Sequence, residues 1–78
     1  MWTVDFSEEA KFYLLDNYPY TFDLHVRMEG LKFEPDGVPP EGLTPVGEGD
    51  LYLWFVLDHV VVLSRIRGQI TIEAIKPL

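Results

Sequence analysis

Positions in the last third of the chain alternate with the period of two that β-strands show. Three such runs follow one another between residues 50 and 78, written DLYLWFVL, VVVLSRIR and QITIEAIKPL. Turn residues separate the runs, at Asp58-His59 and around Gly68. The pattern predicts an antiparallel three-stranded meander, and this meander contains most of the apolar mass of the chain.

The register of the meander follows from side-chain parity. A two-residue turn at Asp58-His59 sets Leu57 opposite Val60. A three-residue loop over residues 67–69 sets Ile66 opposite Ile70, and it extends one aliphatic face across all three strands. A two-residue loop would instead place Arg65 and Arg67 against isoleucines, so we expect the longer loop.

The second face of the predicted meander has a different character. It carries apolar residues at one end and polar residues at the far end: Tyr52, Trp54, Val56, Val61, Leu63, Ile75, Arg65, Arg67, Thr71 and Glu73. A sheet face in water alternates polar residues along its whole length. We therefore expect other parts of the structure to cover Trp54, Val61 and Leu63.

The N-terminal segment predicts a strand that runs directly into a helix. Residues 2–6 alternate apolar and polar side chains. Ser7 is a typical helix N-cap, and Glu8 and Glu9 follow it at the positive end of the helix dipole. The helix extends to about Asn17, because the residue before Pro19 is disfavoured in helical conformation.

Residues 20–34 fit two structures. Phe22, Leu24, Val26 and Met28 alternate with polar residues, which favours a β-hairpin with a turn at Glu29-Gly30. A helix starting near Pro19 is the alternative, and it places four apolar residues on one face: Tyr20, Leu24, Met28 and Leu31. Periodicity alone leaves both structures open.

Residues 34–49 are rich in proline and glycine and predict a long connection, with Leu43 and Val46 anchoring it to the body. The chain of 78 residues is long enough for one domain. We therefore predict a single α+β domain over residues 1–78, in the order β-α-α-β-β-β, with a hairpin at residues 20–34 as the alternative to the second helix.

Composition disfavours several classes of function and partner. Thirteen acidic residues against six basic ones give a net charge of −7, which disfavours a nucleic-acid partner. The chain has no cysteine, no apolar run as long as a membrane helix and no signal-peptide pattern, so we expect a cytoplasmic protein. No set of metal ligands or cofactor motif is recognisable, and we expect neither a metal nor a cofactor.

The order of elements resembles that of the RelE/ParE toxin superfamily of toxin–antitoxin systems. The residues that carry the resemblance are Trp2-Thr3-Val4-Asp5-Phe6-Ser7-Glu8-Glu9-Ala10, Leu31-Lys32-Phe33-Glu34-Pro35, Gly47-Glu48-Gly49-Asp50-Leu51-Tyr52, Leu57-Asp58-His59 and Ile75-Lys76-Pro77. In that family a short strand leads into two helices, a proline-bearing connection and an antiparallel meander. The resemblance therefore favours a helix at residues 20–34.

The resemblance also implies a chemistry, and the chain departs from it. RNA-cleaving members of the family use Arg and Lys side chains, often with a C-terminal Tyr or His, to position and protonate mRNA on the ribosome. Val60 stands where the family commonly has Arg, and the chain ends soon after Lys76. The catalytic candidates that remain are Arg65, Arg67, Lys76 and His59, and they do not supply every role that phosphodiester cleavage needs.

Other chemistry is outweighed by structural explanations. His59 lies at a turn, where histidines are common, and has no catalytic partner beyond Asp58. His25 lies on the polar side of its segment and is expected at the surface. The acidic residues near the N-terminus are explained by the helix dipole rather than by hydrolysis.

Three functional hypotheses follow. In the first, the protein binds an antitoxin-like partner across the sheet residues Tyr52, Trp54, Val56, Val61 and Leu63, with little or no nuclease activity. In the second, the same face makes a non-enzymatic homodimer. In the third, the protein is an active ribosome-dependent mRNA interferase that relies on Arg65, Arg67 and Lys76.

Overall fold

The computed structural model describes residues 1–78. The elements in chain order are β1 (Thr3–Phe6), α1 (Glu8–Asp16), α2 (Phe22–Glu29), a 3-10 turn η1 (Gly30–Phe33), β2 (Thr44–Pro45), β3 (Leu51–Val56), β4 (His59–Ile66) and β5 (Gln69–Pro77). This order confirms the predicted α+β fold with a strand, two helices and a C-terminal meander. Residues 20–34 form a helix and a 3-10 turn rather than a hairpin.

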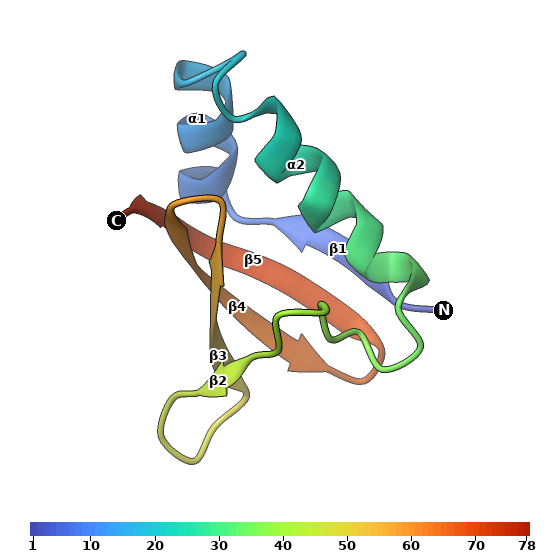
Figure 1. Ribbon diagram of the computed structural model, residues 1–78. Coiled ribbons are helices and arrows are strands. Elements are labelled where there is room, and N and C mark those ends of the chain that lie inside the picture. The colour runs from blue at the N-terminus through green and yellow to red at the C-terminus, as the bar shows by residue number, and fades with distance from the viewer.

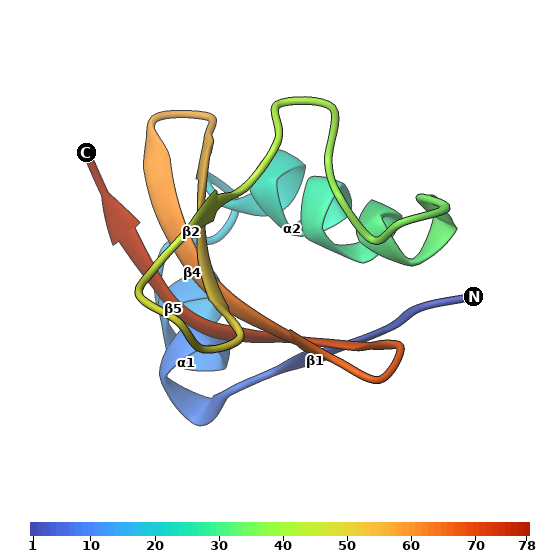
Figure 2. The ribbon, with the colours of Figure 1, turned by 90° about the horizontal axis from the view of Figure 1, so that it is seen from below.

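All five strands belong to one sheet, in the order β1-β5-β4-β3-β2. The N-terminal strand β1 pairs with β5 in parallel, and the other neighbours are antiparallel. In Figure 1, α2 runs alongside β1 and α1 stands beyond the upper end of the sheet, and Figure 2 shows α2 within the curve of the sheet. Side chains of both helices pack with sheet residues in one hydrophobic core.

Local signals in the sequence explain the bounds of α1. The Ser7 hydroxyl accepts a hydrogen bond from the Ala10 backbone N–H at 3.1 Å, as predicted for the N-cap. The helix ends at Asn17, whose side-chain amide donates to the Tyr13 carbonyl at 2.8 Å. The Thr21 hydroxyl then donates to the Leu14 carbonyl at 2.8 Å and ties the start of α2 to the end of α1.

Residues 22–33 are helical because the helical spacing places their largest aliphatic side chains in the core. Leu24, Met28 and Leu31 are buried against the sheet. As a consequence, Phe22, Val26 and Phe33 point away from the core and are more than half exposed. The alternating pattern is therefore real in the sequence, but tertiary packing overrides it.

The first hairpin of the meander differs from the prediction by one turn position. Its two turn residues are Leu57 and Asp58, with φ of 48° and 60°, rather than Asp58 and His59. Phe55 pairs with Val60 as a consequence. Relative to the prediction, the pairing partner of each β3 residue lies two positions earlier in β4. A shift of two residues keeps every side chain of β3 and β4 on its predicted face.

The second hairpin also has a two-residue turn, at Arg67-Gly68, rather than the expected three-residue loop. Ile66 therefore pairs with Gln69. A bulge between Val62 and Leu63 then shifts the pairing by one residue. On the far side of the bulge from the turn, Val62 pairs with Ala74, as predicted. The two-residue turn pairs Ile70 with Arg65 and Ile72 with Leu63, which places both isoleucines on the helix side, where they are fully buried.

The covering layer that Trp54, Val61 and Leu63 require is supplied by the chain itself. These residues are fully buried beneath α1, α2 and η1, in a core of twelve apolar side chains. The face left open is the aliphatic one, which carries Phe55 and Ile66. The sheet is thus apolar on both sides, and the helices shield only the side that carries the tryptophan.

The connection from η1 to β2 is held by two arginines. Arg65 of β4 donates to the Asp36 carbonyl, and Arg27 of α2 pairs with Glu41.

Gly37 allows close approach to the Trp2 ring, because a Cβ there would lie 2.7 Å from it. Leu43 packs against the core as predicted. Val46 was expected to anchor the connection, but it is exposed because it lies opposite Leu51 at the sheet edge.

Candidate functional site

The four catalytic candidates do not converge. Arg65 and Arg67 lie at the end of β4 and the turn after it, whereas His59 is the first residue of that strand and Lys76 lies near the end of β5. At about 3.3 Å per strand residue, His59 and Arg65 are roughly 20 Å apart. No single phosphate group can contact both ends of this strand.

Arg65 is occupied by structural contacts. Its guanidinium lies 5.1 Å from the centroid of the Trp2 ring and 5.4 Å from that of Tyr52, and it also donates to the Asp36 carbonyl. Contacts of this kind with aromatic faces are favourable because the ring faces are electron-rich. Arg65 therefore joins the N-terminus, the connection and the sheet, whereas Arg67 is exposed at its turn.

His59 is buried and bonded at both ring nitrogens. Nδ1 lies 2.7 Å from the Leu57 carbonyl oxygen, and Nε2 lies 2.7 Å from the Tyr13 hydroxyl. A carbonyl oxygen only accepts, so Nδ1 carries a proton, and in the neutral ring Nε2 accepts from Tyr13. Burial, and to a smaller extent the charge of Tyr20, raise the pKa of Tyr13. The pair joins α1 to the β3–β4 turn.

Lys76 and the acidic residues form no site of their own. The Lys76 ammonium lies 3.7 Å from a Glu9 carboxylate oxygen, with both side chains largely exposed. No group of three or more His, Cys, Asp or Glu side chains is placed to hold a metal ion. None of the helices is long and apolar enough to cross a membrane.

The residues predicted to bind a partner lie mostly in the core. Trp54, Val56, Val61 and Leu63 are buried, and Tyr52 is partly buried beside Arg65. In the folded chain a partner reaches these side chains only if the helices move away. A partner-binding surface therefore has to be sought elsewhere on the molecule.

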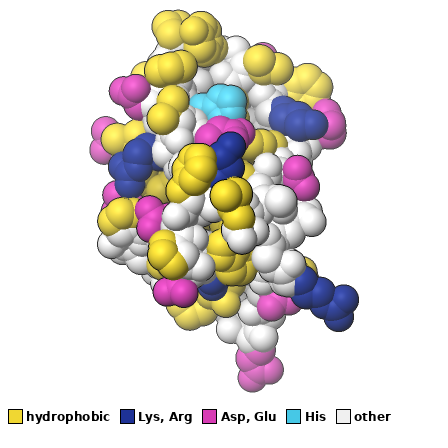
Figure 3. Space-filling view, turned by 90° about the vertical axis from the view of Figure 1, so that its right-hand side faces the viewer, with side chains coloured by type: hydrophobic (Ala, Val, Ile, Leu, Met, Phe, Trp, Pro, Cys, Tyr) yellow, Lys and Arg dark blue, Asp and Glu magenta, His cyan; other side chains and the backbone are white.

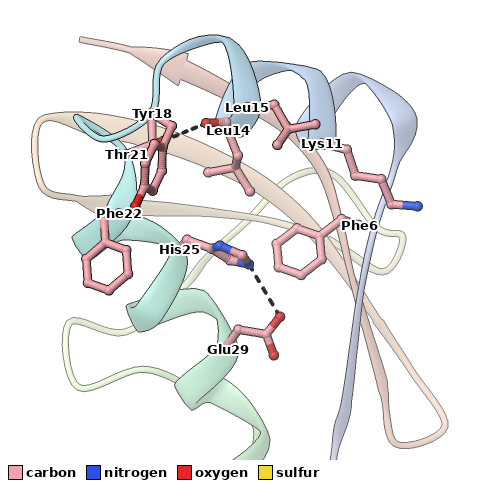
Figure 4. Close-up of a pocket in the computed structure, with 9 residues that line it drawn as sticks. All are labelled: Phe6, Lys11, Leu14, Leu15, Tyr18, Thr21, Phe22, His25 and Glu29. Atoms are coloured by element: carbon pink, nitrogen blue, oxygen red, sulfur yellow. Dashed lines mark hydrogen bonds and ion pairs between the residues drawn. The ribbon is translucent and has the colours of Figure 1, made fainter.

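The clearest such surface is a groove between α1 and α2, with a volume of about 310 Å³. Figure 4 shows side chains of α1 and α2 around it, with Phe6 of β1 to one side next to His25. The groove is lined by Phe6, Lys11, Leu14, Leu15, Tyr18, Thr21, Phe22, His25 and Glu29. We call it the interhelical groove.

The walls of the interhelical groove are apolar and open to water. Leu15 is 73% exposed, Tyr18 67% and Phe22 53%. A second hollow continues along α2 past Phe22 to Val26 and Phe33. Figure 3 shows hydrophobic side chains in several clusters on the side of the molecule at the right of Figure 1, between acidic and basic ones. Because aromatic side chains are large, the exposed rings of Tyr18 and Phe22 add much apolar area to the surface. A monomer of this size rarely exposes so large an apolar patch.

His25 provides polar groups inside this apolar surface. Its ring meets that of Phe6 edge to face, with centroids 5.4 Å apart, and Nε2 lies 3.5 Å from a Glu29 carboxylate oxygen. The sequence predicted a surface residue here, and the side chain is 48% exposed.

The groove itself was not predicted, because it depends on the angle between two helices. The apolar residues on the second side of α2 were its only signal.

No protein-family model, curated protein or solved structure matches this chain. The functional argument therefore has to come from the groove, the sheet and the basic residues themselves.

Proposed function

We propose that this chain is a RelE/ParE-like protein that binds a protein partner and does not cleave RNA. The observation that carries the proposal is the interhelical groove, whose apolar walls the chain leaves uncovered. The order of strand, two helices and meander agrees with the resemblance drawn from the sequence. That order occurs in other folds too, so the resemblance supports the proposal without carrying it.

The basic residues support the non-enzymatic part of the proposal. General acid–base catalysis of RNA cleavage needs donor and acceptor groups within hydrogen-bond reach of one scissile phosphate. Arg65 is held by Trp2 and Tyr52, and His59 is bonded at both nitrogens at the other end of β4. Arg67 alone is free at the surface near Arg65, and the net charge of −7 opposes RNA binding.

The shape of the groove favours the apolar face of an amphipathic helix as the partner segment. Two helices with an apolar floor between them form the usual receptor for such a segment. Tyr18 and Phe22 are aromatic side chains of the kind that is enriched at protein interfaces. A partner helix lying there would cover the groove and the hollow beside Phe33.

An antitoxin-like partner is expected to be encoded by a small gene next to this one, and the test is association with the product of such a gene. The two proteins are co-expressed, purified, and titrated by calorimetry. Phe22→Glu places a charge on the groove wall, and we expect it to weaken binding by about tenfold or more. Phe55→Glu is the matched control, because Phe55 on the sheet is 51% exposed and Phe22 is 53% exposed.

Two results would contradict the proposal. The first is equal binding by Phe22→Glu and the wild-type chain. The second is growth arrest on expression of the chain alone, removed by the double variant Arg67→Ala/Lys76→Ala. Both of these positions are exposed, so loss of arrest would reflect catalysis or RNA contact rather than unfolding.

A further inference from the structure

The outer face of the sheet carries a second uncovered surface, distinct from the interhelical groove. The side chains of β3 and β4 that point away from the helices are apolar with one exception, Ser64: Leu51, Leu53, Phe55, Val60, Val62, Ser64 and Ile66. Val46 joins them at the β2 edge. We call this surface the outer sheet face. None of these side chains is buried in the folded chain.

This composition is unusual for a sheet face in water. An antiparallel sheet with one solvated face normally carries polar residues there. Polar side chains do occur farther along this sheet, where Gln69 contacts Asp5 and Ser64 donates to Glu73. On β3 and β4, however, Phe55 is 51% exposed, Ile66 50% and Leu51 40%. An apolar patch of this kind marks an interaction surface.

The distribution of charge indicates which partner fits. The chain carries a net charge of −7, yet the outward positions of β3 and β4 carry no charge. A strongly basic partner would gain nothing from this face. Two copies of the chain, in contrast, can meet here without bringing like charges into direct contact. The same patch on both copies is what a two-fold symmetric interface requires.

The edge next to this surface limits the geometry. The edge strand β2 is two residues long and ends at Pro45, which has no backbone N–H to donate. Both features disfavour extension of the sheet by a second copy along β2. Packing of one sheet face on another, at a spacing of about 10 Å, remains.

We propose that the chain forms a homodimer in which the outer sheet faces of two copies pack against each other. β3 and β4, of six and eight residues, together with the short β2 beside them give a footprint of roughly 15 by 20 Å, on the order of 300 Å² per copy. A standard interface buries about 800 Å² per partner, so we expect this dimer to be weak and reversible. The proposal is independent of the partner in the interhelical groove.

Sedimentation equilibrium over a wide concentration series tests the dimer. The wild-type chain is expected to change from monomer to dimer as its concentration rises. Phe55→Glu places a carboxylate at the centre of the outer sheet face, so we expect it to weaken dimerisation by about tenfold or more. Phe22→Glu, with the same change of side chain and charge in the groove, is expected to dimerise like the wild type.

Three outcomes would overturn the dimer. The wild-type chain remains monomeric at the highest concentration reached, or Phe55→Glu dimerises as strongly as the wild type, or only Phe22→Glu becomes monomeric. Circular dichroism of each variant confirms that it is folded. If Phe55→Glu fails to fold, Phe55→Ala removes the ring without adding charge, and its dimer is still expected to be weaker than that of the wild type.

Discussion

At the scale of single residues, the role of Arg65 is decided by where the fold places its side chain. In the sequence it is one of few basic residues and so a candidate for phosphate binding. In the structure its guanidinium lies between Trp2 and Tyr52 and bonds the connection at Asp36. Its contacts join three segments that are distant in the chain, so its role follows from the fold and is structural.

Replacing Arg65 is therefore expected to affect stability. Two cation–π contacts and one hydrogen bond from a charged donor suggest that Arg65→Ala costs about 1–3 kcal/mol of unfolding free energy. Arg67→Ala, at an exposed turn, is expected to stay within about 0.5 kcal/mol of the wild type. Urea denaturation of the two variants measures this difference. Equal stability of the two would show that the Arg65 contacts contribute little.

Glu41 gives a second prediction at this scale. A hydrogen bond from Arg27, aided by one from Trp54, holds the pKa of Glu41 below its ordinary value of 4.5. The folded state then binds the proton less tightly than the unfolded state. The resulting stability is present above pH 4.5 and is lost as the pH falls through the lowered pKa.

Glu41→Gln is the variant that tests this. Its melting temperature is expected to fall less than that of the wild type between pH 7 and pH 3, because one acid-sensitive contact is gone. Since both partners are more than a third exposed, the difference should be small. Parallel melting curves for the two proteins would exclude a contribution from Glu41.

At the scale of elements, the turn of the first hairpin contains an unfavourable residue. Leu57 and Asp58 both have positive φ, which Asp tolerates but Leu adopts only with strain. The sequence signal therefore pointed to the wrong pair of residues. In the observed register Leu57 occupies the turn, and Trp54 lies opposite Val61.

Repairing the turn should stabilise the protein. The double variant Leu57→Asn/Asp58→Gly is expected to raise the unfolding free energy by about 1 kcal/mol, since it removes strain from two left-handed positions. The Leu57 carbonyl that bonds His59 belongs to the backbone and is kept. Thermal and urea unfolding measure the gain, and a loss of stability would mean that the Leu57 side chain makes a contact of its own.

Helix α2 shows the opposite relation between sequence and element. Its residues alternate as a strand would, yet they fold as a helix because the sheet needs Leu24 and Met28 over its apolar face. Phe22 and Val26 are left outside by the same choice. The interhelical groove is thus a direct consequence of packing a strand-like sequence as a helix.

At the scale of the whole molecule, the sheet has two apolar faces and the chain has one helical layer. Residues 8–33 can cover only one face, so the outer sheet face stays open. The groove on the helical side is a second open surface. Together they favour a protein that works by binding other proteins, and the scattered basic residues give no support to nuclease chemistry.

The sequence alone determined the order of elements, the cap of α1 and the two-sided apolar character of the meander, because these depend on local spacing. The tertiary structure decided the turn positions, the bulge, the helical state of residues 22–33 and which face is covered. These depend on how much apolar surface each arrangement buries in total, and distant parts of the chain contribute to that sum. For the same reason, Arg65 became a structural residue and Trp54 a core residue.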